Sequence, residues 1–293
     1  MNYHLPSNNN IPARLETISN DISFSRKTST HNASYTYHRH NGCEIYLFLS
    51  GNIHLYIEQS CFLLEPGSLV VLNPNEMHRI HCIDTSPYER IVINIKRDYL
   101  QKLSTDDFSL EKCFFSRALG QNNLCVLSKE NLTRFLFLYD NLCQTASDSY
   151  YGRQIAQNSY VALLLLFINQ QFQTNSSVYR STMPDYIAQS MQYIDTHLES
   201  PLHLSVLAEQ FHISKNYLSM QFKKHTGLTL RSYILDRKIQ YAKTLLQKGT
   251  TVTDACFQSG FNDYANFIRS FTKYVGISPG KYRLSVSKNA NAH

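Results

Sequence analysis

The chain has 293 residues, of which 43% are apolar, and it contains only 10 Gly and 8 Pro. This length suits two ordinary domains, and the composition excludes a disordered or fibrous chain. The net charge of +6 arises from one region, since residues 184–293 hold 13 Lys and Arg against 7 Asp and Glu, and the residues before them hold 15 of each. Positive charge confined to one region is typical of a module that binds a polyanion.

The start of the chain lacks the basic head and apolar core of a secretory signal, so we expect a cytoplasmic protein. The most apolar run, 160–168, is far shorter than the roughly 20 residues that cross a bilayer, so no membrane partner is expected. The seven cysteines show no C-x-x-C pair, which argues against a disulfide framework or a zinc finger. They are interpreted as reduced, mostly buried thiols.

Residues 35–95 show the alternation and turn signals of antiparallel β-structure. In 53–58, for example, Ile and Leu alternate with His, Tyr and Glu, directly after the turn at Gly51-Asn52. The predicted strands cover 44–50, 53–58, 68–72, about 79–83, and 88–95. Closely spaced short strands of this kind predict a small barrel or jelly roll.

After about residue 108 the apolar period changes towards 3.6, which predicts helices appended to the barrel. One predicted helix face contains Leu132, Phe135, Leu136, Tyr139 and Leu142, and another contains Ile155, Tyr160, Leu163, Leu164 and Phe167. The polar segment 173–184 is interpreted as a linker. The expected domains are therefore 1–172 and 185–293.

The region after the linker is predicted to be entirely helical. Helices are expected over 185–198, 205–211, 214–225, about 229–248, 252–259 and 263–274, with a short final turn from 278. Thr251 and Asp254 form a capping box, and the helix ends are followed by Gly227, Gly249, Gly260 and Gly276. Ser278-Pro279 supplies an N-cap with Pro at the first helical position.

Two segments of this region, 205–225 and 252–274, repeat one plan of a short helix, a tight turn and a longer helix. Their apolar positions fix the crossing of the helices, and their polar outer faces could reach base edges in a major groove. The packing residues are Leu207, Phe211, Ile213, Leu218 and Phe222 in the first copy, and Val252, Ala255, Phe261, Phe267 and Phe271 in the second. A connecting helix of about 20 residues would be about 30 Å long, which is close to the roughly 34 Å turn of B-DNA. Two helix-turn-helix units on a long helix could therefore enter successive major grooves.

The residues of this region resemble the AraC/XylS family of transcription regulators over about 185–283. The matching positions are Ser214, Tyr217, Leu218, Ser219, Phe222, Lys223, Lys224, Gly227, Tyr233, Arg237, Ala242, Val252, Gly260, Phe261, Asp263, Phe267, Arg269, Phe271, Lys273, Gly276, Pro279, Tyr282 and Arg283. The resemblance implies a two-domain protein with an N-terminal cupin-like sensor barrel and a C-terminal double helix-turn-helix domain.

The resemblance also implies residue roles and partners. Base contacts would come from Asn216, Ser219, Met220, Tyr264, Asn266 and Arg269, and phosphate contacts from Lys215, Lys223, Lys224 and Lys273. Arg is suited to a guanine and Asn to an adenine, whereas Lys binds phosphates without reading sequence. The expected partners are double-stranded promoter DNA, RNA polymerase, a small-molecule effector and a second copy of the chain. The protein would be a ligand-responsive activator with no catalytic residues.

A weaker pattern lies in the barrel, where His38, His40, Glu44 and His78 resemble the metal-binding residues of cupins. His38, His40 and Glu44 are interpreted as alternating on one strand that faces the interior, with His78 arriving from a second hairpin. Residue 76 departs from the pattern, since it is Glu where the second cupin motif has Gly. Sensor domains of AraC-like regulators commonly carry such a pattern without a metal, so no metal or other cofactor is expected.

The favoured use of the same interior is recognition of a small polar effector, for which a sugar is one candidate. The candidate effector residues are His38, His40, Glu44, Tyr46, His54, Tyr56 and His78. An alternative is a metal-dependent cupin enzyme with an accessory helical domain, and a third is a constitutive regulator whose barrel only dimerises.

Overall fold

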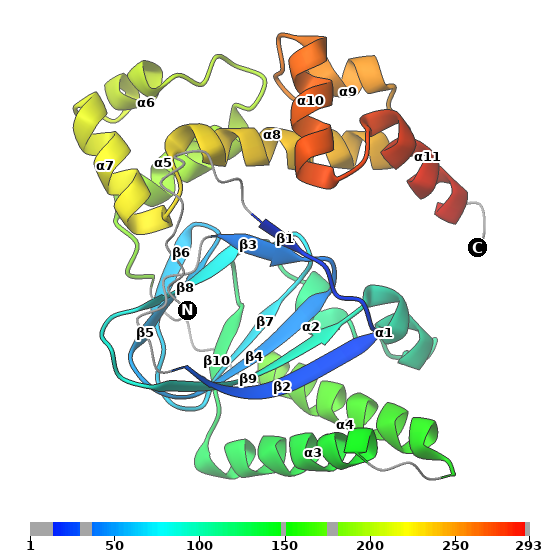
Figure 1. Ribbon diagram of the computed structural model, residues 1–293. Helices are drawn as coiled ribbons and strands as arrows, with labels where there is room; N and C mark the ends of the chain where they lie inside the picture. Colours follow the sequence, from blue (N-terminus) through cyan, green and yellow to red (C-terminus); the bar gives the residue numbers. More distant parts are fainter. Residues whose placement is uncertain (1–13, 30–36, 148–150, 175–180, 291–293) are drawn as a thin grey trace, which may run out of the picture. The chain divides into compact units, whose positions relative to one another are not determined.

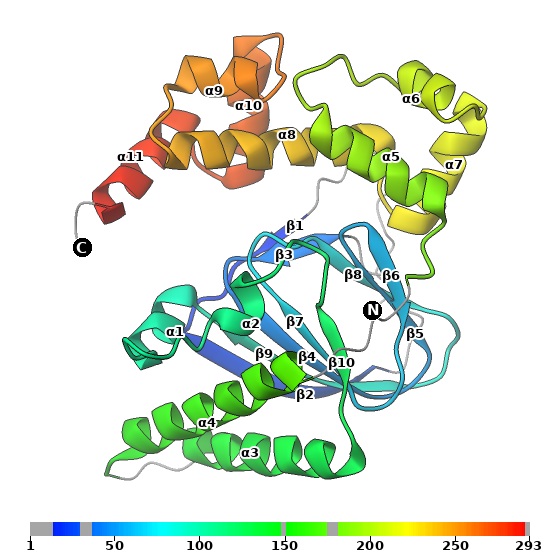
Figure 2. The same cartoon turned by 180° about the vertical axis from the view of Figure 1, so that it is seen from behind.

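The computed structural model describes residues 14–29, 37–147, 151–174 and 181–290, which form two compact units. One unit comprises the described residues of 16–35 and 39–182, and the other comprises those of 183–293 together with the short segments 14–15 and 37–38. Strands and helices α1–α4 make up the first, and helices α5–α11 make up the second (Figures 1 and 2). The chain therefore has the expected two-domain fold, a β-rich domain followed by a helical one.

The strands of the first unit form two five-stranded sheets, with the orders β1-β3-β8-β5-β6 and β10-β7-β4-β9-β2. The strands are β1 (Arg14–Glu16), β2 (Ile22–Ser29), β3 (His38–His40), β4 (Cys43–Ser50), β5 (Ile53–Ile57), β6 (Ser60–Leu63), β7 (Ser68–Leu72), β8 (His78–Cys82), β9 (Tyr88–Ile95) and β10 (Leu124–Val126). Neighbours such as β4 and β9 pair antiparallel, as expected for a barrel of the jelly-roll kind.

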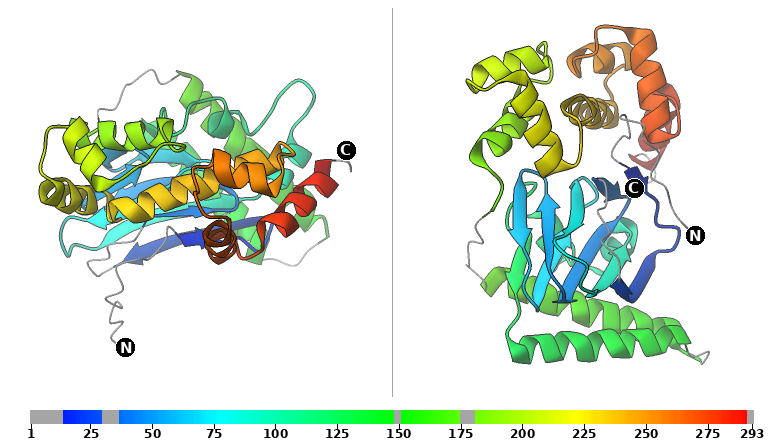
Figure 3. Two further views of the ribbon diagram at one scale, coloured as in Figure 1. Left: turned by 90° about the horizontal axis from the view of Figure 1, so that it is seen from above. Right: turned by 60° about the vertical axis from the view of Figure 1, so that its left-hand side comes forward.

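Alternate residues of β4 belong to two different cores, which define the layers of this unit. Tyr46 and Phe48 pack with residues of β5, β7 and β8 between the two sheets. Ile45 and Leu47 face the other way and pack against helices. The helices are α1 (Arg97–Leu103), α2 (Lys112–Phe115), α3 (Lys129–Ser147) and α4 (Arg153–Thr174). The long pair α3 and α4, green in Figure 3, covers the outer side of the sheet that contains β4.

Five strands are predicted correctly from the sequence, whereas the short strands β1, β6 and β10 and the long β2 are not predicted. Strand β2 pairs along its whole length with β9, from Ile22 opposite Ile95 to Ser29 opposite Tyr88. Only Ile22 and Phe24 pack against the core, and the following residues are mostly exposed. An edge strand that buries so few side chains carries a weak alternation signal.

The prediction that His38, His40 and Glu44 alternate on one strand is wrong. The two histidines lie on β3 and Glu44 lies on β4, in different sheets. The chain turns between them at Asn41-Gly42, where the Asn41 side chain accepts a hydrogen bond from the Ile18 amide. A Cβ on Gly42 would lie 2.7 Å from the Ile95 carbonyl oxygen, so this close approach requires glycine.

The predicted helix faces are confirmed for α3 and partly wrong for α4. Phe135, Tyr139 and Leu142 are buried in α3, as expected. In α4, Leu164 and Phe167 are buried, but Ile155 is 74% exposed and Leu163 is 48% exposed. The outer side of α4 is therefore also apolar, and a periodicity of apolar residues does not separate two apolar sides of one helix.

The second unit contains the helices α5 (Asp185–Thr196), α6 (Leu204–Gln210), α7 (Lys215–Thr226), α8 (Leu230–Gln247), α9 (Val252–Gln258), α10 (Tyr264–Val275) and α11 (Pro279–Ala290). The predicted helices are present, and the expected short final turn is instead a helix of 12 residues. Of the predicted linker 173–184, residues 175–180 lie outside the described residues, as does Tyr35 at the start of the predicted β-region. The predicted domain limits therefore stay predictions.

The helix ends of this unit follow the predicted signals. Thr251 accepts a hydrogen bond from the Asp254 amide, and Ser214 accepts one from the Tyr217 amide. Gly227 and Gly276 adopt the left-handed conformation directly after α7 and α10. Within the part of the chain that the structure describes, no helix combines the length and apolar character needed to span a membrane.

Candidate nucleic-acid interface and barrel polar cluster

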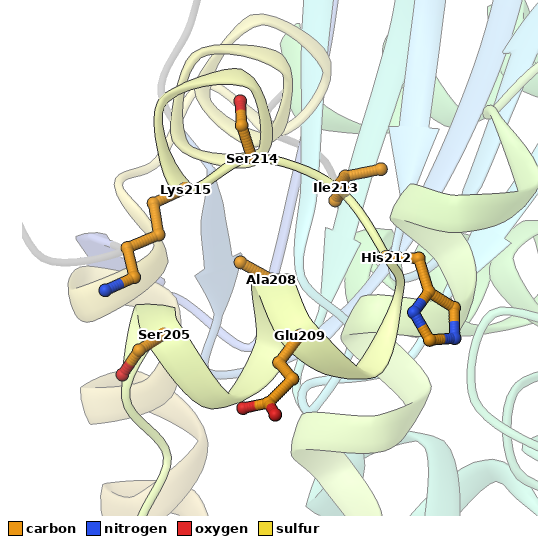
Figure 4. Close-up of a pocket in the computed structure, with 7 residues that line it drawn as sticks. All are labelled: Ser205, Ala208, Glu209, His212, Ile213, Ser214 and Lys215. Atoms are coloured by element: carbon orange, nitrogen blue, oxygen red, sulfur yellow. The ribbon is translucent and has the colours of Figure 1, made fainter.

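The first helix-turn-helix unit consists of α6 and α7. Leu207, Leu218 and Phe222 are completely buried between its helices, while Phe211 and Ile213 are half-buried. The tight turn borders a hollow of about 530 Å³ lined by Ser205, Ala208, Glu209, His212, Ile213, Ser214 and Lys215. Figure 4 shows Ser205 and Glu209 on α6 and Lys215 at the start of α7 around this open hollow.

The second unit consists of α9 and α10 and is held by a line of aromatic rings. The Phe267 ring lies 5.1 Å from the Phe261 ring and 5.6 Å from the Phe271 ring, and Phe271 lies 5.7 Å from Tyr282 of α11. Asp263 caps α10 by accepting a hydrogen bond from the Asn266 amide. One side of α10 is thus fixed in the core, which leaves its polar side outward.

Helix α8 joins the two helix-turn-helix units and lies between them (Figures 1 and 2). Its 18 residues give a length of about 27 Å. On the side of the first helix-turn-helix unit, α8 is bound to α5, because the Arg237 guanidinium of α8 donates to the Asp195 carboxylate of α5 at 2.7 Å. The second helix-turn-helix unit is tied to α8 by the Lys238 ammonium, which donates to the Gly260 carbonyl at the end of α9.

All ten residues predicted to contact DNA lie on α7 or α10 and are exposed. They are Lys215, Asn216, Ser219, Met220, Lys223 and Lys224 on α7, and Tyr264, Asn266, Arg269 and Lys273 on α10. Met220 is 58% exposed and Tyr264 is 44% exposed, which is unusual for side chains of this size. The two helices therefore present comparable outer faces of cations, amides and large side chains.

In the barrel, His40, Glu44 and His78 meet although they come from β3, β4 and β8. Glu44 Oε2 lies 2.6 Å from His40 Nε2, and Glu44 Oε1 lies 3.9 Å from His78 Nε2. The ring centroids of the two histidines are 5.2 Å apart. His38 precedes His40 on β3, and one ring nitrogen from each of the three histidines lies within 4.8 Å of the others. All but the half-buried His38 are buried.

The remaining predicted effector residues fall into two places. Tyr46 lies with Glu44 on the inner side of β4, and burial raises the pKa of its phenol well above the usual value, so the phenol stays protonated. His54 and Tyr56 instead alternate with the inward-facing Leu55 on β5 and lie on its other side. Their rings are 6.1 Å apart, and the Arg79 guanidinium lies 3.9 Å from the centroid of Tyr56.

Glu76 has a buried partner, Arg117, that is not predicted from the sequence. The Glu76 side chain has no exposed surface, and the Arg117 guanidinium donates to both of its carboxylate oxygens at 2.6 Å. The amides of Asn73 and Gly120 and the Asn123 side chain donate to the same carboxylate at 2.9, 2.8 and 3.0 Å. No local pattern could reveal this, because Arg117 follows Glu76 by 41 residues. We call these five residues the Glu76 clamp.

The chain combines a β-barrel with a double helix-turn-helix domain, and both parts match known families. Residues 24–142 match the AraC-like ligand binding domain, and residues 207–285 match a helix-turn-helix domain. The chain belongs to the AraC/XylS family of transcriptional regulators.

Relatives of known sequence include two uncharacterized HTH-type transcriptional regulators. YobQ of Bacillus subtilis strain 168 is 26% identical over 255 residues, which cover 87% of this chain and 91% of YobQ. A regulator of Staphylococcus aureus strain MSSA476 is 23% identical over 250 residues, which cover 84% of this chain. This chain spans about a third of the length of that regulator and of similar ones from other S. aureus strains, with 32% of each covered.

Similar solved structures include ToxT of Vibrio cholerae bound to (E)-4-(8-methylnaphthalen-1-yl)but-3-enoic acid, with 13% identity and a TM-score of 0.38. That match covers 91% of this chain and all of ToxT. The C-terminal domain of the response regulator yesN from Fusobacterium nucleatum is 34% identical, with a TM-score of 0.32. It aligns with 32% of this chain and 94% of its own length.

Proposed function

We propose that the chain is a transcription regulator that binds double-stranded DNA through α7 and α10. The observation that carries this proposal is the exposure of all ten predicted contact residues on two helices that a third helix holds apart. Asn216, Ser219 and Met220 of α7 would face bases in one major groove, and Tyr264, Asn266 and Arg269 of α10 in the next. The four lysines would bind phosphates and set the affinity.

Substituting Arg269 tests the assignment of base reading. The full-length chain first selects its preferred fragments from a random DNA library, and binding to the selected sequence is then measured by fluorescence anisotropy. Arg269→Ala should weaken binding by about 1–3 kcal/mol, or roughly 5- to 150-fold, and relax the preference at one base pair. Lys223→Ala should weaken binding to all sequences alike and lower the slope of log affinity against log salt by about one.

The matched control for charge is Lys102→Ala, which removes an exposed cation from α1 of the barrel unit. Binding that is unchanged in both Arg269→Ala and Lys223→Ala would refute the role of these helices as readers. An equal loss in Lys102→Ala would attribute the effect to net charge rather than to the interface.

The barrel is proposed to bind a small effector between its two sheets, where Glu44 and Tyr46 lie among apolar residues. Such a site is suited to a polar metabolite, and a sugar is one candidate. Binding would shift the chain between arrangements that differ in affinity for promoter DNA. We propose that the protein works in the cytoplasm by binding rather than by catalysis, and that it activates transcription by recruiting RNA polymerase.

We also propose that the regulator acts as a dimer through the outer side of α4. Ile155, Leu163 and Leu166 follow one another along this side and are 74, 48 and 43% exposed, and Phe137 of α3 is 63% exposed. An apolar helix side of this extent marks an interaction surface.

Sedimentation velocity over a range of protein concentrations tests the dimer. Leu163→Glu should weaken self-association at least about tenfold, because a carboxylate would be buried in an apolar interface. Gln258→Glu places the same charge on an exposed position of α9, outside the proposed surface, and should leave the association unchanged. A wild-type chain that stays monomeric, or a Leu163→Glu chain that associates normally, would exclude this surface.

A further inference from the structure

Arg90 of β9 is a buried cation on the inner side of the barrel. Its neighbour Ile91 packs against the helices, whereas Arg90 shares the other side of the strand with Tyr88, which packs between the two sheets. Arg90 is only 9% exposed. Its guanidinium lies 4.3 Å from the centre of the Tyr88 ring and donates to the Ser29 hydroxyl at 2.7 Å. A positive charge is therefore held between the sheets, where the effector is proposed to bind.

The charge of Arg90 is not balanced by an acidic side chain of the described residues. Glu89, the preceding residue, points the other way and pairs with Arg26 at 2.7 Å. The neighbours of the Arg90 guanidinium are a hydroxyl and a ring face, and neither carries a negative charge. A buried cation without a counterion is costly, because no opposite charge replaces the water that it loses. An anionic ligand would supply that charge.

The phenol of Tyr46 is a second buried polar group near Arg90. Tyr46 lies opposite Val92 in the pairing of β4 with β9, and Arg90 is the diagonal neighbour on the same side. The Tyr46 hydroxyl is buried and has no hydrogen-bond partner among the residues that the structure describes. Burial raises the pKa of this phenol, so the hydroxyl keeps its proton and can donate. A neutral donor beside a guanidinium is suited to an oxyanion.

The inner side of β9 leaves room for a ligand beyond Arg90. Val92 and Asn94 lie on the same side of the strand as Arg90 and are half-buried. Ile91 and Ile93, on the side of the helices, have no exposed surface. The inner side is thus less completely covered by side chains than the outer one. The side-chain oxygen of Asn94 also has no hydrogen-bond partner in the described part of the chain, so it can accept one from a ligand.

We propose that the effector is a small organic monocarboxylate, and that Arg90 and Tyr46 bind its carboxylate. The two terminal nitrogens of a guanidinium match the two oxygens of a carboxylate, and Tyr46 donates a further hydrogen bond. The body of the ligand extends over Val92 towards Asn94. One guanidinium balances one negative charge, and Glu44, on the same side of β4 as Tyr46, would repel a second, which disfavours a phosphate dianion. This inference rests on the proposed effector site and specifies its ligand.

Thermal unfolding with matched ligands tests the chemical class of the effector. The full-length chain is heated with benzoate, hexanoate or lactate, with the primary amide of each, with phenyl phosphate, and with glucose. We expect at least one carboxylate to raise the melting temperature while its amide does not. A larger rise with phenyl phosphate than with benzoate would overturn the single-charge assignment. A response to glucose or to the amides alone would overturn the acid but keep the effector site, and a chain that responds to no probe would overturn both.

Two variants test the residues, with calorimetry of the carboxylate that gives the largest rise. Arg90→Met should weaken its binding roughly 10- to 150-fold and bring the affinities for the acid and its amide together. Tyr46→Phe removes one oxygen without changing the shape of the side chain, and should weaken binding roughly 2- to 10-fold. The ligand-free Arg90→Met chain should melt no lower than the wild type, because it loses an unbalanced buried charge.

The matched control is Arg26→Met, which removes a cation from the neighbouring strand β2. Arg26 lies opposite Ile91, on the outer side of the sheet, so the variant should bind the carboxylate as the wild type does. An Arg90→Met chain that still prefers the acid to its amide would overturn the proposed site. An equal loss of binding in Arg26→Met would do the same, because it would attribute the effect to net charge.

Discussion

Replacing Arg117 by alanine should lower the free energy of unfolding of the barrel unit by about 3–5 kcal/mol. The Glu76 carboxylate is fully buried and accepts hydrogen bonds from the two terminal guanidinium nitrogens of Arg117. Removing the cation leaves a charge with no access to water, which costs far more than the ion pair contributes by itself. Arg117 also donates to the Val71 carbonyl of β7, so the substitution removes a hydrogen bond between the segment that contains Arg117 and this strand.

Urea denaturation of the full-length chain, followed by circular dichroism, measures this change. Arg26→Ala is the control, because Arg26 also pairs with a glutamate, Glu89, at 2.7 Å, but its side chain is 49% exposed. That variant should lose only about 0–1 kcal/mol. If the two variants lost the same free energy of unfolding, the burial of the Glu76–Arg117 pair would not explain its contribution to stability.

The second unit is predictable from sequence because its signals are local. Ser214 and Thr251 cap helices that begin at the next residue, and Gly227 ends α7 in the left-handed conformation. The buried positions of α7 and α10 recur at helical spacing, so the exposed faces follow from them. The length of α8 was also predicted closely, since the helix has 18 residues and about 20 were expected.

The barrel was less predictable because its arrangement depends on contacts between distant residues. His40 and Glu44 are four residues apart, yet a turn at Gly42 moves them to different sheets. The spacing alone predicts one continuous strand, since nothing local shows that Ile95 approaches Gly42 so closely. The structure nevertheless brings His40, Glu44 and His78 together, although they come from three strands and not from the two that the spacing predicts.

The same contrast applies to Arg117 and to the outer side of α4. Arg117 is one of 28 basic residues, and only the folded chain distinguishes it from a solvated surface cation. Ile155 belongs to an apolar pattern that the sequence assigns to the core, yet it is exposed. Whether a side chain is buried depends on the elements that pack against its helix or loop, so the sequence of that segment alone does not determine it.

Replacing Gly260 by alanine should destabilise the second helix-turn-helix unit by about 3 kcal/mol or more and abolish specific DNA binding. Gly260 has a φ of +79°, and an added Cβ would lie 1.9 Å from the Leu198 carbonyl oxygen, far inside van der Waals contact. Its carbonyl also accepts from Lys238, which ties the end of α9 to α8. The main chain would have to move, and Phe261, the next residue, would leave the aromatic core that positions α10.

Gly249→Ala separates this collision from the cost of the backbone conformation. Gly249 has a similar φ of +89°, but an added Cβ there meets no atom within 4 Å. It should therefore lose only about 1–2 kcal/mol, the cost of placing an L-residue in the left-handed region. Hydrogen exchange of α9 and α10 and binding to the selected DNA measure both variants. Equal protection in the two variants would mean that the contact with Leu198 yields easily, whereas selective loss in Gly260→Ala would establish that this glycine holds α9 and α10 in place.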